Sequence, residues 1–235
     1  MKKRLIAYLL SAALVLTGAA APALAKLHHE KSVSNPLVDL TALLAPPPAQ
    51  DSEQTKNELI EIHHYQDTRT KDQIAYAQAD ADKNVFRFAD VMGEKFTAEN
   101  LPLTAALFQK ALKATKDTVG PAKDFFNRPR PFVYDHTVNP CLAKEMEPSY
   151  PSNHATSGTV MGILLANMVP EKKAEIFKRG WIYAQNRVIA GMHYRSDIEA
   201  GRISGTVIAA FLLKDKSFAK DFAAAKAELR TALGY

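Results

Sequence analysis

The chain has 235 residues, 47% of them hydrophobic, and carries 30 lysines and arginines against 25 aspartates and glutamates. Its length suits one folded domain, and a single cysteine, Cys141, excludes an intramolecular disulfide bond. The basic excess comes mainly from residues 1–25. Without them 27 basic residues face 25 acidic ones, a net charge of +2, so the composition does not indicate a nucleic-acid-binding role.

Residues 1–25 have the three parts of a secretory signal peptide. A basic start (KKR, residues 2–4) precedes a short apolar run (residues 5–16), and ALA at residues 23–25 is a cleavage motif. A transmembrane anchor fits less well because the apolar run is short and small residues follow it. We therefore expect cleavage after Ala25 and export into a Gram-negative periplasm.

The next segment, residues 26–50, is expected to be extended, and it ends at a run of three prolines. From residue 51 to residue 235, apolar side chains recur at spacings of three and four, which predicts an all-α domain. The expected helices begin with a pattern from residue 59, a second over 74–92 that ends at Gly93, and a third from 103 that closes near Gly120-Pro121. Asp80 and Asp82 lie within the second pattern and are expected to be exposed or to pack between helices.

Residues 122–150 are rich in proline, which predicts loops and short turns rather than long helices. Further helices are expected at about residues 155–168, 171–189, 196–213 and 216–232. The apolar stretches 160–169 and 203–213 are too short to span a bilayer comfortably, so we interpret both as core helices and expect no membrane insertion after signal cleavage. The predicted fold is a single-domain helical bundle with its site at the ends of core helices.

Three short basic clusters follow one another between Lys123 and Asp197. Lys123 and Arg130 belong to the first, Ser152 to the second and Arg187 to the third. Guanidinium groups offer planar paired donors to phosphate, a lysine adds a compact charge, and a serine hydroxyl adds another donor. Cations gathered in one pocket repel each other unless an anion binds between them. These residues therefore predict a phosphate-binding site.

Two histidines in the same clusters supply reactive groups. A neutral imidazole is a nucleophile, and a protonated one, such as His154, can give a proton to a leaving alkoxide. In a helix, His193 and Asp197 would share one face, and Asp197 could accept the Nδ1–H hydrogen bond that orients the ring. Gly191 is a natural place for the preceding helix to break.

Together the clusters K-x6-RP, PSNH and NR-x5-H-x3-D resemble the signature of the type-2 phosphatidic-acid phosphatase and vanadium haloperoxidase superfamily. Within it, the chain looks most similar to bacterial class A non-specific acid phosphatases, which the stretch LLAPPPA at residues 43–49 also resembles. The resemblance implies an all-α fold of that type. It also implies that the phosphoryl oxygens are held by Lys123, Arg130, Ser152, Asn153 and Arg187.

The resemblance further implies a role for each reactive side chain. His193 would attack phosphorus and form a phosphohistidine, Asp197 would orient it, and His154 would be the general acid and later activate water. Asn153 departs from the family pattern, which has glycine there, and Asn186 replaces a serine. In the run RPRP, counting from the first cluster selects Arg130, which leaves Arg128 as a structural or supporting group.

The expected function is a secreted, metal-independent acid phosphatase for soluble phosphate monoesters, with phosphate transfer to alcohols as a side activity. No cofactor or metal is expected, because the sequence has no HExxH, CxxC or carboxylate cluster with metal-ligand spacing. Two alternatives are a vanadate-dependent haloperoxidase and a non-enzymatic periplasmic phosphate-binding protein. Family haloperoxidases are generally larger, and the histidine pair argues against simple binding. The number of subunits stays open, since homo-oligomers are common among similar phosphatases.

Overall fold

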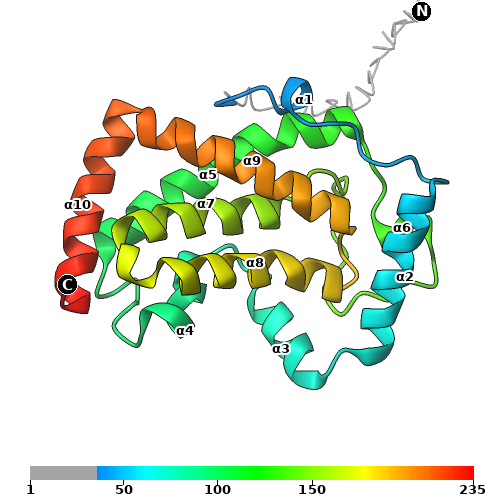
Figure 1. Cartoon of the computed structure of the whole chain (residues 1–235), viewed down its shortest axis with the longest axis horizontal. Coiled ribbons are helices and arrows are strands. Elements are labelled where there is room, and N and C mark those ends of the chain that lie inside the picture. The colour runs from blue at the N-terminus through cyan, green and yellow to red at the C-terminus, as the bar shows by residue number, and fades with distance from the viewer. Residues whose placement is uncertain (1–35) are drawn as a thin grey trace, which may run out of the picture. The chain divides into compact units, whose positions relative to one another are not determined.

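The computed structural model describes residues 36–235, and every regular element in that range is helical (Figure 1). The expected all-α fold is confirmed. The elements in chain order are α1 (Leu40–Leu43), α2 (Glu53–Thr68), α3 (Lys71–Ala79), the 3₁₀ helix η1 (Val85–Phe88), α4 (Ala89–Met92), α5 (Pro102–Phe126), α6 (Pro131–Tyr134), α7 (Asn153–Met168), the 3₁₀ helix η2 (Pro170–Lys172), α8 (Lys173–Ile189), α9 (Arg195–Lys214) and α10 (Lys216–Leu233).

Helix α7 is the central element, with α8 and α9 as its main packing partners. Figure 1 shows these three helices side by side, with α10 crossing one end and α2 at the opposite end. Because α7 has neighbours around its whole circumference, its apolar stretch is almost entirely buried, including Val160, Leu164 and Met168. The prediction of a core helix in this region is confirmed.

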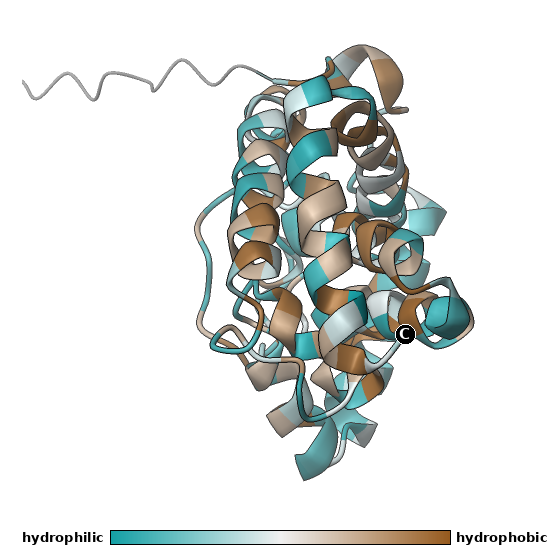
Figure 2. Ribbon diagram, turned by 90° about the vertical axis from the view of Figure 1, so that its left-hand side faces the viewer, coloured by the Kyte–Doolittle hydropathy of each residue, from teal (hydrophilic) through white to brown (hydrophobic). Residues whose placement is uncertain are grey.

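Helices α8 and α9 instead have one buried face and one face toward solvent. Figure 2 shows hydrophobic and hydrophilic residues interspersed along the helices of the bundle. The apolar stretch 203–213 of α9 is therefore only partly a core segment. Ile208 and Leu212 are buried, whereas Ile203 and Phe211 are 44% and 46% exposed. The expectation of a core helix was wrong for this outer face, because the helical period carries part of any continuous apolar run toward solvent.

Small residues let α7 and α9 approach each other closely. A Cβ atom at Gly201 would lie 2.7 Å from the Ser152 carbonyl oxygen, and one at Gly205 would lie 2.6 Å from the Thr156 carbonyl oxygen. Both distances are well short of ordinary contact. Glycine is therefore required at this crossing, which holds the start of α7 against the start of α9.

Helix α5 extends beyond its predicted end near Gly120-Pro121. It continues through Pro121 to Phe126 and ends where Asn127 adopts a left-handed conformation with φ of 43°. Proline in a helix interior costs about 3 kcal/mol, mainly through a lost hydrogen bond and a steric clash. The continuing buried face of the last turn, which includes Ala122 and Lys123, offsets that cost and carries Lys123 into the region of the candidate site.

The predicted helix over 74–92 is divided into separate elements. α3 ends at Ala79, an irregular turn follows, and η1 and α4 complete the segment before Gly93, whose φ is 97°. The turn brings Asp80, 1% exposed, against Arg179 of α8 at 2.7 and 3.0 Å. Of the two roles expected for Asp80, the structure excludes exposure and supports packing between helices, because a buried ion pair joins the turn to α8.

The expected signal peptide, residues 1–25, lies outside the described residues. Of the segment predicted to be extended, residues 36–50 are described, and they include the short helix α1, whose Leu40 is buried. Within residues 36–235, the structure has no helix with the length and apolar character needed to cross a membrane.

Candidate active site

The end of α5 and the turn into α6 deliver the first cluster. Lys123 lies in the last turn of α5, and its Nζ donates a hydrogen bond to the carbonyl oxygen of Pro148. The left-handed Asn127 then redirects the chain so that Arg130 becomes the residue before α6. Arg130 Nη1 donates to the Met192 carbonyl oxygen at 3.1 Å, which anchors the guanidinium beside the third cluster.

The N-terminus of α7 carries the second cluster. Ser152 caps the helix by accepting the Ala155 N–H at 3.3 Å, and its own N–H donates to the Asp197 carbonyl oxygen at 3.0 Å. Asn153 and His154 follow in the first turn, where free N–H groups and the helix dipole favour a bound anion.

Asn153 sits within α7, so the departure from glycine requires no positive φ at this position. Its Oδ1 is buried and has no hydrogen-bond partner among the described residues. The Asn186 side chain, the second departure, points elsewhere and donates to Asp80 Oδ2 at 2.8 Å. Asn186 therefore supports the packing of α8 rather than lining the cation cluster.

The end of α8 and the start of α9 deliver the third cluster. Arg187 lies in the last turn of α8, and Gly191, with φ of 74°, reverses the chain as predicted. His193 lies in this turn, between the two helices and ahead of α9, so it does not share a helix with Asp197. Its Nδ1 nevertheless lies 3.2 Å from Asp197 Oδ2, because the turn folds the ring back over the first turn of α9.

Asp197 is fully buried and bonded on several sides. In addition to the His193 ring, it accepts hydrogen bonds from Ser149 Oγ at 2.5 Å, Arg128 Nη1 at 2.7 Å and the Tyr194 N–H at 2.9 Å. These contacts fix the carboxylate in one orientation. Asp197 in turn determines how the imidazole is presented to the cation cluster.

Arg128 is the group that ties this carboxylate to the rest of the molecule. Its Nη2 donates to Glu58 Oε2 of α2 at 3.0 Å, and its guanidinium lies 3.8 Å from the centre of the Tyr194 ring. Of the two interpretations given for Arg128, the contacts favour a supporting position behind Asp197. Ser149 and Glu58 were not anticipated, since neither belongs to a spacing pattern that sequence alone would reveal.

The opposite nitrogen of His193 faces the cations. Arg130 Nη1 lies 2.8 Å from Nε2, and since a guanidinium only donates, Nε2 carries a lone pair and Nδ1 carries the proton. Burial, followed by the nearby charges of Arg130, Lys123 and Arg187, holds the pKa of His193 well below its usual range. The ring is therefore a neutral imidazole with its free nitrogen directed into the cation cluster.

In His154 the two ring nitrogens have the opposite roles from those in His193. Its Nε2 lies 2.7 Å from the Ala81 carbonyl oxygen, so Nε2 donates and Nδ1 is the nitrogen that exchanges a proton. Burial, then the charges of Arg187 and Lys83, hold the pKa of His154 well below its usual value, while the Ala81 bond and Glu145 oppose that shift. The Arg187 charge thus acts on both imidazoles.

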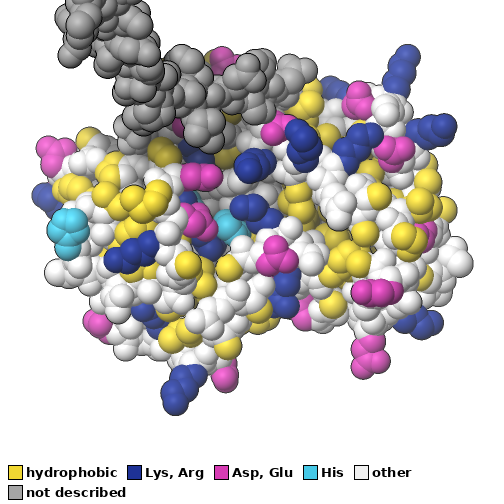
Figure 3. Space-filling view, turned by 180° about the vertical axis from the view of Figure 1, so that it is seen from behind, with side chains coloured by type: hydrophobic (Ala, Val, Ile, Leu, Met, Phe, Trp, Pro, Cys, Tyr) yellow, Lys and Arg dark blue, Asp and Glu magenta, His cyan; other side chains and the backbone are white. Residues whose placement is uncertain are grey.

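The cluster has donors without partners in the described part of the chain, and the Glu145 carboxylate bridges two of its cations. Nε and Nη1 of Arg187 are buried without a hydrogen-bond partner among the described residues. Burial and then the Arg130 charge lower the pKa of Lys123 to about 8. The carboxylate of Glu145, from the loop before α7, contacts both Arg130 and Arg187 at 2.7 Å. Figure 3 shows basic and acidic side chains around a histidine near the middle of the face it presents.

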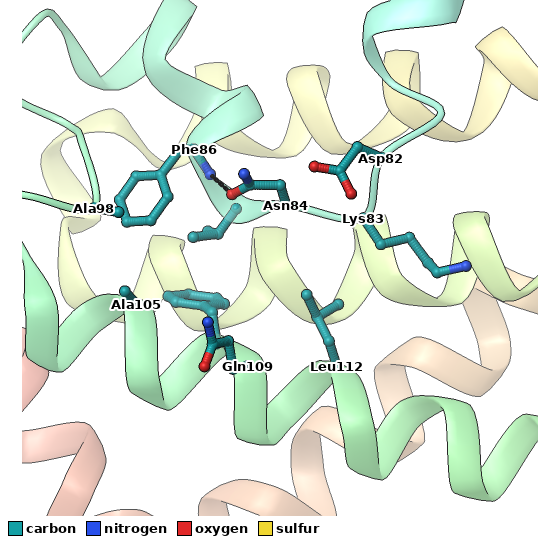
Figure 4. A pocket seen from close by; sticks show the side chains of 10 residues that line it. Asp82, Lys83, Asn84, Phe86, Ala98, Ala105, Gln109 and Leu112 are labelled. Carbon is teal, nitrogen blue, oxygen red and sulfur yellow. Dashed lines mark hydrogen bonds between the residues drawn. The ribbon is translucent and has the colours of Figure 1, made fainter.

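A cavity of about 200 Å³ lies between α5 and the turn that leads to η1 (Figure 4), and its lining includes no residue of the three basic clusters. Its walls include Lys83, Asn84 and Phe86 from the turn and Gln109 and Leu112 from α5.

Within residues 36–235, no group of three or more histidine, cysteine or carboxylate side chains is arranged to hold a metal ion. His63 of α2 pairs with Asp135, with 2.9 Å between Nε2 and Oδ2, away from the basic clusters. Cys141 is half-buried and carries a free thiol.

Relatives of known name match most of the chain. An acid phosphatase of Zymomonas mobilis is 33% identical over 80% of this chain and 75% of its own length, and a non-specific acid phosphatase of Providencia stuartii is 30% identical over 81% of each. A non-specific acid phosphatase of Salmonella typhi is 35% identical, and the match spans 65% of each chain.

A solved structure supports the fold. The crystal structure of a bacterial vanadium-dependent iodoperoxidase superposes with a TM-score of 0.55 at 20% identity, over 71% of this chain and 51% of that one. The model of the PAP2 superfamily matches residues 102–220, which include all three basic clusters. With that match and the phosphatase relatives, the chain belongs to the PAP2 superfamily.

Proposed function

We propose that this protein is a metal-independent acid phosphatase that hydrolyses phosphate monoesters through a phosphohistidine at His193. The observation that carries the proposal is the contact between Arg130 and His193 Nε2, which puts a neutral, oriented imidazole among the three cations. The acid phosphatase names of the relatives from Zymomonas, Providencia and Salmonella agree with this activity.

The cations and the start of α7 would bind the phosphoryl oxygens. Arg187 has two buried donors to spare, Lys123 and Arg130 add charge, and Asn153 and His154 bring the free N–H groups of the first turn of α7, which Ser152 caps. Phosphoryl transfer depends mainly on positioning and on stabilising the charge of the equatorial oxygens. This set of donors meets both needs with side chains and backbone alone.

Catalysis would proceed in two displacements. The Nε2 lone pair of His193 attacks phosphorus as the bond to the ester oxygen breaks, and His154 Nδ1 gives its proton to that oxygen. In the second step His154 Nδ1 takes a proton from water, whose oxygen attacks phosphorus as the P–N bond breaks. Inorganic phosphate leaves, and His193 returns to its starting tautomer, held by Asp197.

An acid optimum follows from the charges in the site. Without a ligand, burial and the cations keep both imidazoles neutral, whereas a bound phosphate dianion raises the pKa of each and lets His154 take up its proton. The rate then depends on a protonated His154 and an unprotonated His193. This pair gives a bell-shaped profile whose limbs belong to coupled groups.

The proposal includes export of the protein from the cytoplasm. The pattern of residues 1–25 supports secretion into the periplasm with cleavage after Ala25, where water-soluble monoesters are the expected substrates. Fractionation of an expressing Gram-negative cell, with the N-terminus of the product sequenced, tests it. A cytoplasmic product that begins at Met1 would contradict export without bearing on the chemistry.

The central experiment is hydrolysis of p-nitrophenyl phosphate at pH 5–6 in EDTA by wild type and His193→Ala. Loss of the nucleophile is expected to lower kcat by at least about 1000-fold. His64→Ala, which removes an exposed histidine of α2, is the matched control and is expected to keep full turnover. Rapid quench in alkali should also trap a phosphorylated His193 in the wild type.

Other outcomes would contradict the proposal in distinct ways. Equal turnover in wild type and His193→Ala would mean that another group is the nucleophile. Activity that is lost in EDTA and restored by zinc or magnesium would mean that a metal ion takes part. Halide oxidation after vanadate loading, with no phosphate release, would favour the peroxidase alternative.

A further inference from the structure

The carboxylate of Glu145 bridges the two arginines of the cation cluster. Its Oε1 accepts a hydrogen bond from Arg187 Nη2 at 2.7 Å, and its Oε2 accepts one from Arg130 Nη2 at the same distance. Both arginine side chains are 2% exposed, whereas the Glu145 side chain is 38% exposed. An acidic group thus reaches from the surface into a buried cationic site.

The position of this carboxylate is close to the reactive nitrogen. Arg130 uses Nη2 for Glu145 and Nη1 for His193 Nε2, so one planar guanidinium holds the carboxylate and the imidazole side by side. Two oxygens, each on a different arginine, reproduce two of the contacts that a phosphate would make there. Phosphate and the Glu145 carboxylate therefore require the same donors.

Glu145 satisfies the cluster only in part. The carboxylate brings two oxygens and one negative charge, while Nε and Nη1 of Arg187 remain buried without partners among the described residues. A phosphate dianion offers more acceptors and twice the charge. The site is thus built for a ligand with more oxygens than its internal occupant has.

The surrounding loop allows the carboxylate to leave. The chain is anchored on one side by the Cys141 N–H, which donates to the Ala190 carbonyl oxygen, and on the other by the Ser149 N–H, which donates to the Arg128 carbonyl oxygen. In the part of the chain that the structure describes, residues 142–146 have no backbone–backbone hydrogen bond. Packing holds the first part of this segment, since Leu142 lies against the core and Lys144 Nζ lies 5.5 Å from the centre of the Phe132 ring. Met146, directly after Glu145, is 87% exposed, so the Glu145 side chain has room to swing outward.

From these contacts we propose that Glu145 is a built-in competitor for phosphate, which occupies the arginine pair in the resting protein and must be displaced by each substrate. The inference rests on the proposed function of the same site. It makes Glu145 a determinant of anion affinity and of the choice between anions. Singly charged anions gain little over the carboxylate they replace, whereas dianionic phosphate esters gain both charge and contacts.

Mildly acidic pH does not neutralise the Glu145 carboxylate. Burial raises the pKa of Glu145, but Arg187 and then Arg130 outweigh it and hold the pKa at about 2. At mildly acidic pH, well above that value, the carboxylate stays ionised, so the competition persists across the range in which an acid phosphatase works. A neutral side chain at position 145 is needed to abolish it.

The size of the effect depends on the fraction of molecules in which Glu145 occupies the arginine pair. When the binding-competent state is a fraction of the population, the apparent Kd exceeds the intrinsic Kd by the inverse of that fraction. We expect Glu145→Gln to bind phosphate about tenfold more tightly, which corresponds to about 1.4 kcal/mol. The exposure of Glu145 and the ordering of its loop keep the value well below that of two fully buried charged hydrogen bonds.

The experiment measures binding of inorganic phosphate by calorimetry at pH 6 for wild type, Glu145→Gln, Glu145→Ala and Glu147→Gln. Both changes at 145 are expected to lower Kd about tenfold, and the KM for p-nitrophenyl phosphate should fall in parallel. Glu147→Gln removes the same charge from the same loop and keeps the backbone carbonyl oxygen of residue 147, which accepts a hydrogen bond from Arg130 Nε at 2.8 Å. Its side chain forms no ion pair with either arginine, and a change of no more than about twofold is expected there. Glu145→Ala shows whether tighter binding in Glu145→Gln depends on the amide group that glutamine introduces.

Each remaining outcome separates this inference from the proposed function. Unchanged or weaker phosphate binding in both variants at 145, with normal turnover in the wild type, would overturn the competitor role of Glu145. The proposed phosphatase activity would stand. Equal tightening by Glu147→Gln would also overturn it, since a general charge effect would then suffice. Failure of all four proteins to bind phosphate, with no turnover, would overturn both proposals.

Discussion

Replacing Gly201 by alanine tests whether the close crossing of α7 and α9 sets the geometry of the site. The added Cβ would lie 2.7 Å from both the Ala155 Cβ and the Ser152 carbonyl oxygen, and 3.1 Å from the Thr156 nitrogen. These distances fall up to about 0.7 Å short of the 3.4 Å at which ordinary contact begins. Two of the three atoms belong to the backbone, so the helices themselves must separate.

The stability cost is the balance of two terms. Overpacking of a close-packed site costs about 1–3 kcal/mol, and replacement of a glycine inside a helix returns about 1 kcal/mol. We expect a net loss of about 1 kcal/mol in the free energy of unfolding. Activity should suffer more, because the Ser152–Asp197 backbone bond spans this crossing and a displacement near 1 Å can cost about 100-fold in rate.

Urea unfolding and kcat for p-nitrophenyl phosphate measure the two effects separately. Gly162→Ala is the matched control on α7, since its Cβ would meet only the Ile176 carbonyl oxygen at 3.9 Å and the Phe177 ring at 4.0 Å. It should keep full turnover and gain up to about 1 kcal/mol in stability. If Gly201→Ala matches Gly162→Ala in both measurements, the close approach does not position the active-site residues.

Two further substitutions probe the surroundings of the imidazoles. Arg128→Met leaves the buried carboxylates of Glu58 and Asp197 without their shared cation, and urea unfolding should show a loss of about 3–5 kcal/mol; a loss below about 1 kcal/mol would contradict the buried pairing. Lys83→Gln removes a positive charge that, after burial and Arg187, lowers the pKa of His154. That pKa should rise, the general acid should stay protonated to higher pH, and the alkaline limb of kcat should move upward; an unmoved limb would show that Lys83 does not act on His154.

The helices around the core were predictable, and the breaks between them were not. α8 and α9 follow from apolar periodicity, because that pattern reports the burial of one helix face, and α7 follows from a continuous apolar run, which reports burial on all sides. The end of α3 depends on Asp80 reaching Arg179, a contact 99 residues away in sequence that no local pattern contains. Helix α5 passes Pro121 for a similar reason, since the packing of its last turn outweighs a local breaker.

The residues of the candidate site were also only partly predictable from the sequence. The motif spacing pointed to Arg130 and Asp197, which contact the His193 ring, and to Lys123 and Arg187, whose charges act on it. Ser149 and Glu58 had no such signal, since their contacts with Asp197 and Arg128 depend on how a loop and a distant helix fold back. Glu145 was equally hidden: its importance comes from where an irregular loop places an ordinary surface residue.

The bonds from Glu58 through Arg128 to Asp197 also bear on how the molecule acquires activity. They join α2, the α5–α6 turn and α9, so the orienting carboxylate is held by segments from both ends of the described chain. Closing such long loops is entropically unfavourable and belongs to the later part of folding. Helices can therefore form, and phosphate can meet isolated arginines, well before turnover begins. Enzymatic activity is thus a reporter of completed tertiary assembly, and a chain that has not yet closed these contacts is catalytically silent.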